Sequence, residues 1–237
     1  MKGVILAGGT GSRLSPLTDA VNKHLLPVGH KPMLYHVIEK FVTAGISDIM
    51  ITTGTEHAGD IFQTLGSGKK FGAKFTYRVQ DEAGGIAQAL SLVEEFVHDD
   101  KFMVILGDNL FQDDLGRVVK RFEEQEGGAR VLLKRVNDPE RFGVATVDEA
   151  GAITKIVEKP TKPESHMAVT GCYLYHPDVF DVVKTLKPSG RGELEITDVN
   201  MHYVKSGNMF CDVLQGWWTD AGTFESLKRA QLLVERL

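Results

Sequence analysis

The sequence predicts a single α/β domain built on a mixed, mostly parallel sheet flanked by helices. In the first half of the chain, short apolar runs alternate with segments whose apolar residues recur every three or four positions. Such alternation is typical of a parallel sheet covered on both faces. Runs such as VILA at 4–7 and MVIL at 103–106 are apolar without interruption, as in strands buried on both faces. In the second half, strand-like runs follow one another, which predicts a β-rich half added to the same core.

The expected elements can be placed in chain order. Apolar runs containing β-branched side chains predict four strands, at residues 3–6, 49–53, 75–79 and 102–106. Helical spacing of apolar residues predicts three helices, at residues 33–44, 57–65 and 84–96. Four strands with no helix between them are expected next, at residues 129–135, 143–147, 153–158 and 169–175. Helices are expected again at residues 179–186, 196–205 and 223–236. The intervening loops are too short to be domain linkers, so one domain with two functional halves is expected.

The composition is that of an ordinary globular protein. Of the 237 residues, 42% are hydrophobic and 25% are charged. A net charge of −5 and a pI of about 5.9 argue against a nucleic-acid-binding face. No apolar run approaches the roughly 20 residues that cross a bilayer, and the N-terminus lacks the apolar core of a secretory signal. Cys172 and Cys211 form no disulfide or metal-ligand pattern. Together, these observations lead us to expect a cytoplasmic protein that binds neither membranes nor nucleic acids.

A glycine-rich segment follows the first expected strand. It reads AGGTGSR at residues 7–13, and its glycines remove Cβ atoms so that several backbone N–H groups can approach an anion. Arg13 adds a permanent positive charge whose planar fork matches phosphate. The segment lacks the Gly-Lys-Ser/Thr ending of a P-loop and the third glycine of a dinucleotide-binding turn. On these residues alone, a phosphate-binding loop and a structural turn both stay open.

Two aspartates stand where apolar runs end. Asp108 follows MVILG, at the carboxyl end of an expected strand, where open α/β sheets bind their ligands. A turn-forming Asp-Asn pair is an equal alternative there. Asp220, in WWTDAGT, precedes the last expected helix, where an N-terminal cap is the alternative role. A pair of carboxylates completed by water and phosphate oxygens is a usual way to hold Mg²⁺.

The glycine-rich segment continues as GGTGSRLSPLTDAVNKHLLPVGHKPM, and this spelling resembles the signature of the nucleoside-diphosphate-sugar pyrophosphorylases. Within that family the chain is most similar to the glucose-1-phosphate thymidylyltransferases, to about Leu232. The resemblance implies a Rossmann-like nucleotidyltransferase domain, with residues 1–128 binding the nucleotide and residues 129–237 the sugar phosphate. It implies Mg²⁺-dependent transfer of a nucleotidyl group from dTTP to glucose 1-phosphate, by in-line attack on the α-phosphate. The products would be dTDP-glucose and pyrophosphate, in a first step of dTDP-rhamnose-type sugar synthesis, and the enzyme would be a dimer or tetramer.

The same resemblance implies roles for individual residues. Those implied to act in catalysis are Arg13, Lys23, Asp108 and Lys159. The nucleotide is implied to be bound by Leu6, Gly8, Gly9, Gly11, Ser12, Arg13, Lys23, Gln80, Gly85 and Asp108. The sugar phosphate is implied to be bound by Asn109, Gly143, Glu158, Lys159 and Val169. The metal is implied to be held by Asp108 and Asp220. Glu193 and Glu195 also fit the family spelling, with a role at a helix start as the alternative.

The base is expected to be read at Gln80, which ends an expected strand. An amide both donates and accepts, which suits the imide edge of thymine or uracil. A single methyl group distinguishes these two bases, and it contributes about 1–3 kcal/mol in an apolar pocket. We therefore expect dTTP to be preferred, with measurable use of UTP.

Three features depart from the family pattern. The base loop reads QDEAGG, where typical thymidylyltransferases have Pro-Ser-Pro-Asp before the glycine. His24 stands where many members have glutamine, and we expect it to be a non-catalytic loop residue. The chain also ends soon after the last expected helix begins, so we expect feedback regulation to be weaker or differently built.

Other functions stay open at this stage. One keeps the chemistry and changes the substrate, as in a UDP-glucose or other sugar-nucleotide pyrophosphorylase. Another is a non-catalytic nucleotide-sugar sensor, against which the presence of Arg13, Asp108, Lys159 and Asp220 argues. A dinucleotide-dependent oxidoreductase is disfavoured by the glycine spacing.

Overall fold

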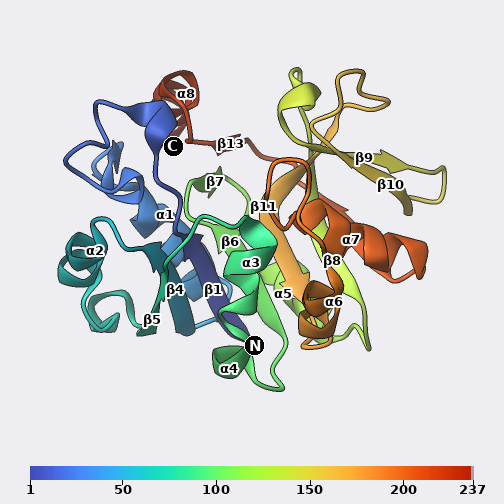
Figure 1. The fold of residues 1–237 in the computed structure, drawn as a ribbon, viewed down its shortest axis with the longest axis horizontal. Helices are drawn as coiled ribbons and strands as arrows, with labels where there is room; N and C mark the ends of the chain where they lie inside the picture. The colour runs from blue at the N-terminus through green and yellow to red at the C-terminus, as the bar shows by residue number, and fades with distance from the viewer. Residues whose placement is uncertain (236–237) are drawn as a thin grey trace.

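A nine-stranded mixed sheet runs through the computed structural model, which describes residues 1–235 (Figure 1). The path of paired strands is β10-β9-β11-β6-β1-β4-β5, with β8 beside β11 and β12 beside β8. The strands of the first half are β1 (Lys2–Ala7), β4 (Asp48–Gly54), β5 (Lys74–Gln80) and β6 (Phe102–Leu106). Those of the second half are β8 (Ala129–Arg135), β9 (Gly143–Val147), β10 (Ile153–Glu158), β11 (Met167–Tyr175) and β12 (Met209–Val213). Only β10 and β11 run against the other strands of this sheet, so the expected mixed, mostly parallel sheet is confirmed.

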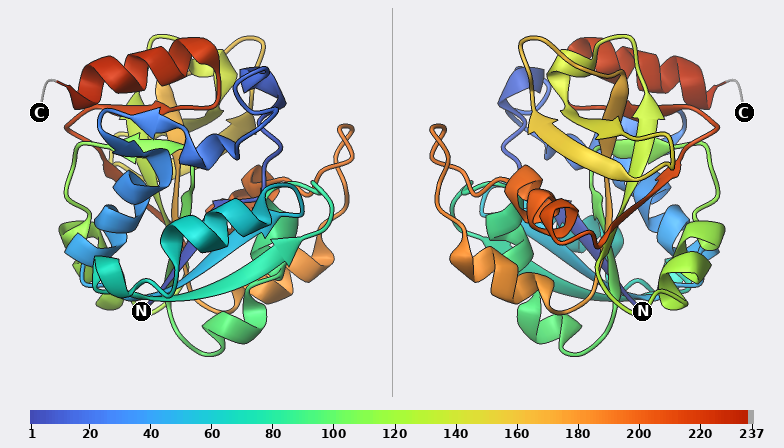
Figure 2. Two further views of the ribbon diagram at one scale, coloured as in Figure 1. Left: turned by 90° about the vertical axis from the view of Figure 1, so that its left-hand side faces the viewer. Right: turned by 90° about the vertical axis from the view of Figure 1, so that its right-hand side faces the viewer.

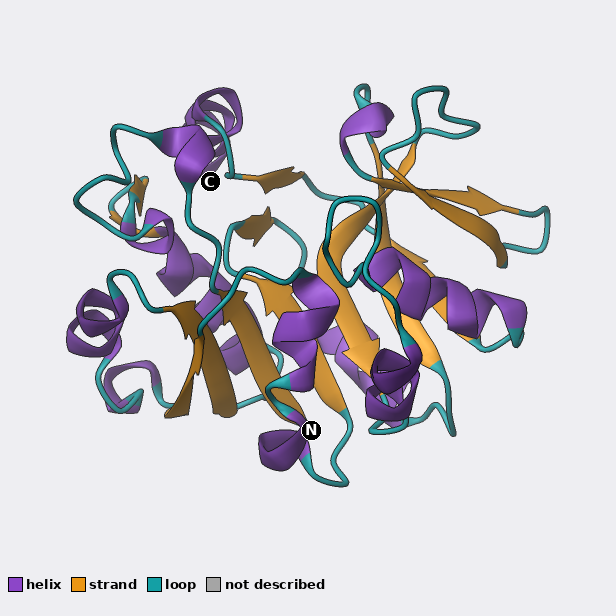
Figure 3. Ribbon diagram, viewed as in Figure 1, coloured by secondary structure: helices purple, strands orange, loops and turns teal. Residues whose placement is uncertain are grey.

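Helices cover both faces of the sheet, as Figures 2 and 3 show. On one face lie α1 (Met33–Thr43), α2 (Ala58–Leu65) and α5 (Gly116–Glu123), whereas α8 (Phe224–Val234) lies beyond the carboxyl ends of the strands, at the top of Figure 1. On the other lie α3 (Ile86–Ser91), α4 (Glu94–Val97), α6 (Val179–Thr185) and α7 (Ile196–Lys205). Along β1, Ile5 and Ala7 pack into the hydrophobic core on the α1 side of the sheet, whereas Val4 and Leu6 pack into the core on the α3 side. Because successive side chains point to opposite faces and both faces are buried, residues 4–7 of β1 are all apolar.

The sheet forks along β11, its longest strand. Residues 172–175 of β11 pair with β6, whereas residues 167–168 pair with β9. The register of β11 against β8 is irregular between these two stretches. The β9–β10 hairpin therefore leans away from β6, and the fork opens beside the carboxyl end of β6 (Figure 1). A short ribbon of β7 (Asn109–Phe111) and β13 (Trp218–Asp220) lies at this opening.

Several elements differ from the sequence-based expectation. The expected helix 84–96 is two helices, α3 and α4: α3 begins only after Gly85, whose φ is 98°, and α4 begins after Val93, whose φ of −105° is not helical. A short 3-10 turn at Pro139–Arg141 lies between β8 and β9, where no helix was expected. Elements that were not expected are α5, β7, β12, β13 and a small ribbon of β2 (Pro27–Val28) and β3 (Lys31–Pro32). The expected end of the last helix, Arg236, lies outside the described residues. Within residues 1–235, no helix combines the length and apolarity needed to cross a membrane.

Candidate active site

Two adjoining cavities, of about 550 and 430 Å³, open at the fork and beside the glycine-rich loop. Both are lined by Arg13, Asp108 and Lys159. The larger, which we call the loop cavity, is also lined by the predicted residues Leu6, Gly8, Gly9, Lys23, Gln80 and Gly85. The smaller, which we call the fork cavity, is also lined by the predicted residues Asn109, Gly143, Glu158, Val169 and Asp220. The structure thus brings nearly all the predicted residues together around a shared boundary.

Gly11 and Ser12 line neither cavity. Gly11 has a φ of 71°, in the left-handed region, and its carbonyl oxygen accepts a hydrogen bond of 2.9 Å from the Thr18 hydroxyl. Ser12 begins the 3-10 turn Ser12–Leu14 that carries Arg13. Both residues shape the loop and direct Arg13 into the shared boundary.

Asp108 forms the central ion pair of the shared boundary. It follows β6, and its Oδ2 lies 2.6 Å from Lys23 Nζ, while its Oδ1 accepts a hydrogen bond of 3.0 Å from Asn109 Nδ2. Burial alone would raise the pKa of Asp108, but the Lys23 ammonium and these hydrogen bonds outweigh it and hold that pKa well below its usual range. Asp108 is therefore a largely buried carboxylate that is ionised at physiological pH, with one contact on each of its oxygens.

His24 lies beside this pair but is neutral at physiological pH. It is almost completely buried against Gly107, and its Nδ1 lies 2.8 Å from Asn22 Oδ1. Burial, reinforced by the charge of Lys23, lowers the pKa of His24 to about 3. Because Asn22 Oδ1 can only accept, the neutral ring carries its proton on Nδ1.

A second carboxylate, Asp220, faces the same space as Asp108. A Cβ placed on Gly222 would lie 3.1 Å from Arg13 Nη2, 3.4 Å from Asp108 Oδ2 and 3.6 Å from Asp220 Oδ2, so both carboxylates and the Arg13 guanidinium border the space that this glycine leaves. Burial and the charge of Asp108 raise the pKa of Asp220, and Arg141 lies 3.4 Å from its Oδ1. The helix cap that follows is Thr223, paired with Ser226 in a capping box, so Asp220 does not cap α8.

The space at Gly222 brings together two carboxylates, the donor groups of many divalent-cation sites, beside the Arg13 guanidinium. Two carboxylate oxygens offer the hard ligands that Mg²⁺ prefers, and a cation between them would relieve their mutual repulsion. Within residues 1–235, no cluster of three or more His, Cys, Asp or Glu residues is placed to hold a metal ion. A metal held by this carboxylate pair would therefore complete its coordination with water and substrate oxygens.

Asn109 is held in one orientation by two donors. Its Oδ1 accepts hydrogen bonds from the Gly171 N–H at 2.9 Å and from the Trp218 indole N–H at 2.8 Å. With its carbonyl oxygen occupied, the Asn109 amide presents Nδ2 to Asp108. A Cβ on Gly171 would lie 2.6 Å from the Asn109 amide, so this packing requires glycine in β11. The fork of the sheet and the β7–β13 ribbon together orient Asp108.

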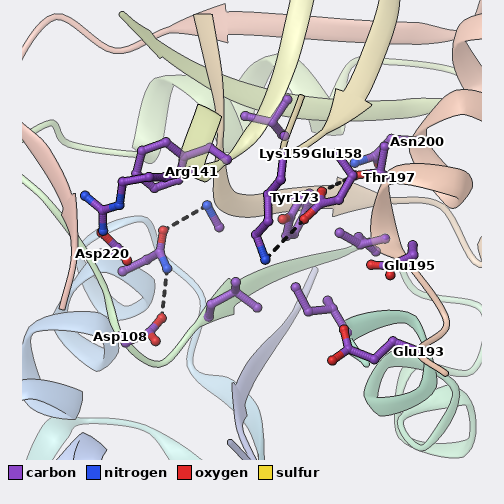
Figure 4. Close-up of a pocket in the computed structure, with 18 of the residues that line it drawn as sticks. Asp108, Arg141, Glu158, Lys159, Tyr173, Glu193, Glu195, Thr197, Asn200 and Asp220 are labelled. Atoms are coloured by element: carbon purple, nitrogen blue, oxygen red, sulfur yellow. Dashed lines mark hydrogen bonds and ion pairs between the residues drawn. The ribbon is translucent and has the colours of Figure 1, made fainter. Parts of the chain in front are cut away.

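The far wall of the fork cavity carries opposite charges. Glu158 accepts a hydrogen bond of 2.7 Å from the Thr197 hydroxyl, and Lys159 Nζ lies 3.6 Å from its Oε1 (Figure 4). Lys159 has a φ of 41°, an uncommon left-handed conformation for a residue with a side chain, and its N–H bonds to the Phe142 carbonyl at 3.0 Å. This turn brings the half-exposed Lys159 side chain to the boundary of both cavities.

Glu195 occupies the N-terminal position of α7 but makes no capping hydrogen bond. Its carboxylate bonds instead to Arg191 at 2.8 Å and to the Ser189 hydroxyl at 2.7 Å. Burial would raise the pKa of Glu195, but these contacts outweigh it and lower that pKa. Arg191 also lies 3.6 Å from Glu158, so these charges form one network on the cavity wall.

Several lining residues were not predicted from the sequence. They are Arg141, Arg191, Thr197 and Trp218, together with Gly222 at the carboxylate pair. Arg141 precedes the RFGVA motif's glycine, and Arg191 opens RGELEITD, so both lie inside segments that the resemblance had singled out. A search of those segments for cations that could meet an anionic substrate would have found both.

Comparisons with known proteins agree with this geometry. The model of the family named Nucleotidyl transferase matches residues 2–236. A glucose-1-phosphate thymidylyltransferase of Neisseria meningitidis is 43% identical over 238 residues, which cover 99% of this chain and 83% of that protein. A low-salt glycan biosynthesis nucleotidyltransferase of Haloferax volcanii is 41% identical over 235 residues, which cover 99% of this chain and 66% of that relative. A crystal structure assigned to a glucose-1-phosphate thymidylyltransferase of Bacillus anthracis, in complex with sucrose, is 58% identical with a TM-score of 0.96, over 100% of this chain and 96% of that one.

Proposed function

Because this chain belongs to the nucleotidyl transferase family, we propose that it transfers a thymidylyl group from dTTP to glucose 1-phosphate and releases pyrophosphate. The names of its relatives support this choice of substrates. The observation that carries the proposal is that two cavities, each large enough for a substrate, meet at Arg13, Asp108 and Lys159. The proposed setting is the cytoplasm, with the chain assembled as a dimer or tetramer.

The reaction requires one anion to approach another. A sugar phosphate is already ionised at neutral pH, so it needs no strong general base to become a nucleophile. The main task is therefore to neutralise charge and to align the attacking oxygen with the α-phosphate. The cations at the boundary suit this task, and the neutral His24 fits a reaction without a strong base.

We assign the nucleotide to the loop cavity and the sugar phosphate to the fork cavity. Backbone N–H groups around Gly8 and Gly9, with Arg13 and Lys23, are proposed to bind the triphosphate. Lys159 is proposed to bind the sugar phosphate, and Glu158 a sugar hydroxyl. The first 128 residues would thus supply most nucleotide contacts, and the remainder most sugar contacts.

Enzymes of this family generally use a divalent metal, and we propose Mg²⁺ held by Asp108 and Asp220. When bound there, the ion would add positive charge next to the α-phosphate. Lys23 and Arg141, which contact these two carboxylates, would keep them ionised and oriented.

The nucleotide preference can be tested directly. We expect dTTP to be used best with glucose 1-phosphate, UTP to be used measurably, and CTP and GTP to be used much less, because the thymine methyl adds about 1–3 kcal/mol and the imide edge matches Gln80. A matrix of nucleoside triphosphates against sugar 1-phosphates, scored by released pyrophosphate, measures this order.

Each result of the matrix has a defined reading. A preference for UTP would favour a UDP-glucose pyrophosphorylase, and equal use of GTP or CTP would contradict the base assignment. If no pair of substrates releases pyrophosphate, the proposed reaction is contradicted and a nucleotide-sugar sensor is favoured.

Replacing Lys159 by alanine should mainly weaken sugar-phosphate binding. A charge-assisted hydrogen bond contributes about 1.5–3 kcal/mol, so we expect the Michaelis constant for glucose 1-phosphate to rise about 10- to 100-fold. The Michaelis constant for dTTP should change much less. Lys162→Ala, which removes an exposed lysine three residues away, is the matched control. An unchanged Michaelis constant for the sugar phosphate would remove Lys159 from this role.

A further inference from the structure

The Gln80 side chain is held at one end by a second glutamine. Gln80 ends β5 and is 6% exposed, and it lines the loop cavity. Its Nε2 donates a hydrogen bond of 2.6 Å to Oε1 of Gln88, which belongs to α3. Gln88 packs against the chain before it, because a Cβ on Gly84 would lie 2.9 Å from Gln88 Cγ. The Gln88 side chain thus packs against the turn that begins α3.

The carbonyl end of Gln80 is in a different environment. A Cβ on Gly8 would lie 2.1 Å from Gln80 Oε1, so this oxygen packs against the Cα of the glycine-rich loop. An oxygen there can make a weak C–H···O contact, whereas an NH₂ group would face a CH₂ group that cannot accept. Among the hydrogen bonds of residues 1–235, none ends on Gln80 Oε1, so this acceptor is available to a ligand in the loop cavity.

The orientation of this amide decides which pyrimidine it can pair with. Thymine and uracil carry an N3–H donor beside a carbonyl oxygen, whereas cytosine has an acceptor at N3 beside an amino group. A glutamine that presents its oxygen to N3 accepts from thymine but meets an unprotonated acceptor on cytosine. The same side chain, rotated by 180° about its last torsion, would present its NH₂ and suit cytosine. An amide free to rotate would discriminate poorly.

We propose that Gln88 is a specificity-determining residue that holds Gln80 in the orientation for an imide base. It acts through Gln80 and need not touch the base itself. This inference rests on the proposed function, since it takes Gln80 as the residue that reads the base. Gly8 permits this orientation because it has no side chain, and a Cβ at that position would displace Gln80 Oε1.

Three substitutions at position 88 test the proposal, because they change only what Gln80 can bond to. Gln88→Glu keeps an acceptor, so the ratio of kcat/KM for dTTP to that for CTP should stay within about twofold of the unaltered enzyme. Gln88→Leu removes the partner, so the ratio should fall about tenfold, the factor that one hydrogen bond contributes. Gln88→Lys offers only donors, so it should turn the Gln80 oxygen toward position 88 and lower the ratio below that of Gln88→Leu. The ratio is measured by pyrophosphate release with glucose 1-phosphate.

The readout separates this proposal from a structural effect and from the proposed function. A partly unfolded variant loses activity with both nucleotides equally, and an added charge affects two triphosphates of equal charge alike. Ser91→Ala is the matched control, because the Ser91 hydroxyl donates to the backbone carbonyl of Gln88 rather than to its side chain. If Gln88→Leu and Gln88→Lys keep the original ratio, the proposal is wrong although the reaction stands. If the unaltered protein does not use dTTP, the proposed function itself fails.

Discussion

Replacement of Asp108 by asparagine is expected to lower turnover about 10³-fold or more at saturating substrates. The substitution keeps the shape of the side chain but removes a negative charge that we propose to bind the metal. It also leaves the Lys23 ammonium, whose side chain is 11% exposed, without its ion-pair partner. Pyrophosphate release by the purified variant, with circular dichroism to follow folding, measures both effects.

Two controls make the Asp108 result interpretable. Asp99→Asn changes an exposed carboxylate and should leave turnover unchanged. Because an unpaired buried charge costs about 3–5 kcal/mol, whereas replacing both partners is often nearly neutral, the double variant Asp108→Asn/Lys23→Met should recover stability but not turnover. Near-normal rates in a folded Asp108→Asn variant would remove the metal role from this residue.

Replacement of Asp220 by asparagine is expected to lower turnover about 10²-fold or more and to raise the magnesium concentration required. Asp220 can bind a metal only when ionised, and its pKa is raised by burial and by the charge of Asp108. As the pH falls through this raised pKa, Asp220 takes up a proton and the magnesium concentration that the unaltered enzyme requires should rise. The rise should begin at a higher pH than it would for an aspartate with an ordinary pKa. Asparagine has no proton to lose in this range, so the variant should lose this pH dependence.

A magnesium titration at several pH values measures the Asp220 effect. Glu225→Gln is the matched control, because it removes an exposed carboxylate from the first turn of α8, the helix that follows Asp220. This variant should behave as the unaltered enzyme does. A normal magnesium requirement in Asp220→Asn at every pH would show that Asp220 does not hold the metal.

The elements that the sequence predicted well are those with strong local patterns. The strands β8 to β11 lie within two residues of their expected bounds, and β1 and β6 were recognisable as uninterrupted apolar runs. The ribbon of β7 and β13 was missed because each strand has three residues and their pairing joins segments more than 100 residues apart. No local period marks a strand whose stability comes from such a distant partner.

The candidate site shows the same division. Motifs indicated Arg13, Asp108 and Lys159, because their residue types and spacing carry the resemblance. Spelling could not separate a metal-binding Asp220 from a helix cap, and the structure excludes the cap, because Thr223 caps α8. Gln88 had no sequence signal at all, since its contact with Gln80 depends on how α3 packs beside the end of β5.

The sequence by itself determined the alternation of elements and the uninterrupted apolar runs of the central strands, and the spelling of the glycine-rich segment indicated the family. These are properties of neighbouring residues, expressed as periods, apolar runs and short motifs. Only the tertiary structure decided that Asp108 and Asp220 face one gap at Gly222, and that two cavities share one charged boundary. The physical reason is that side-chain convergence depends on long-range packing, here the fork of β11, which no local pattern encodes.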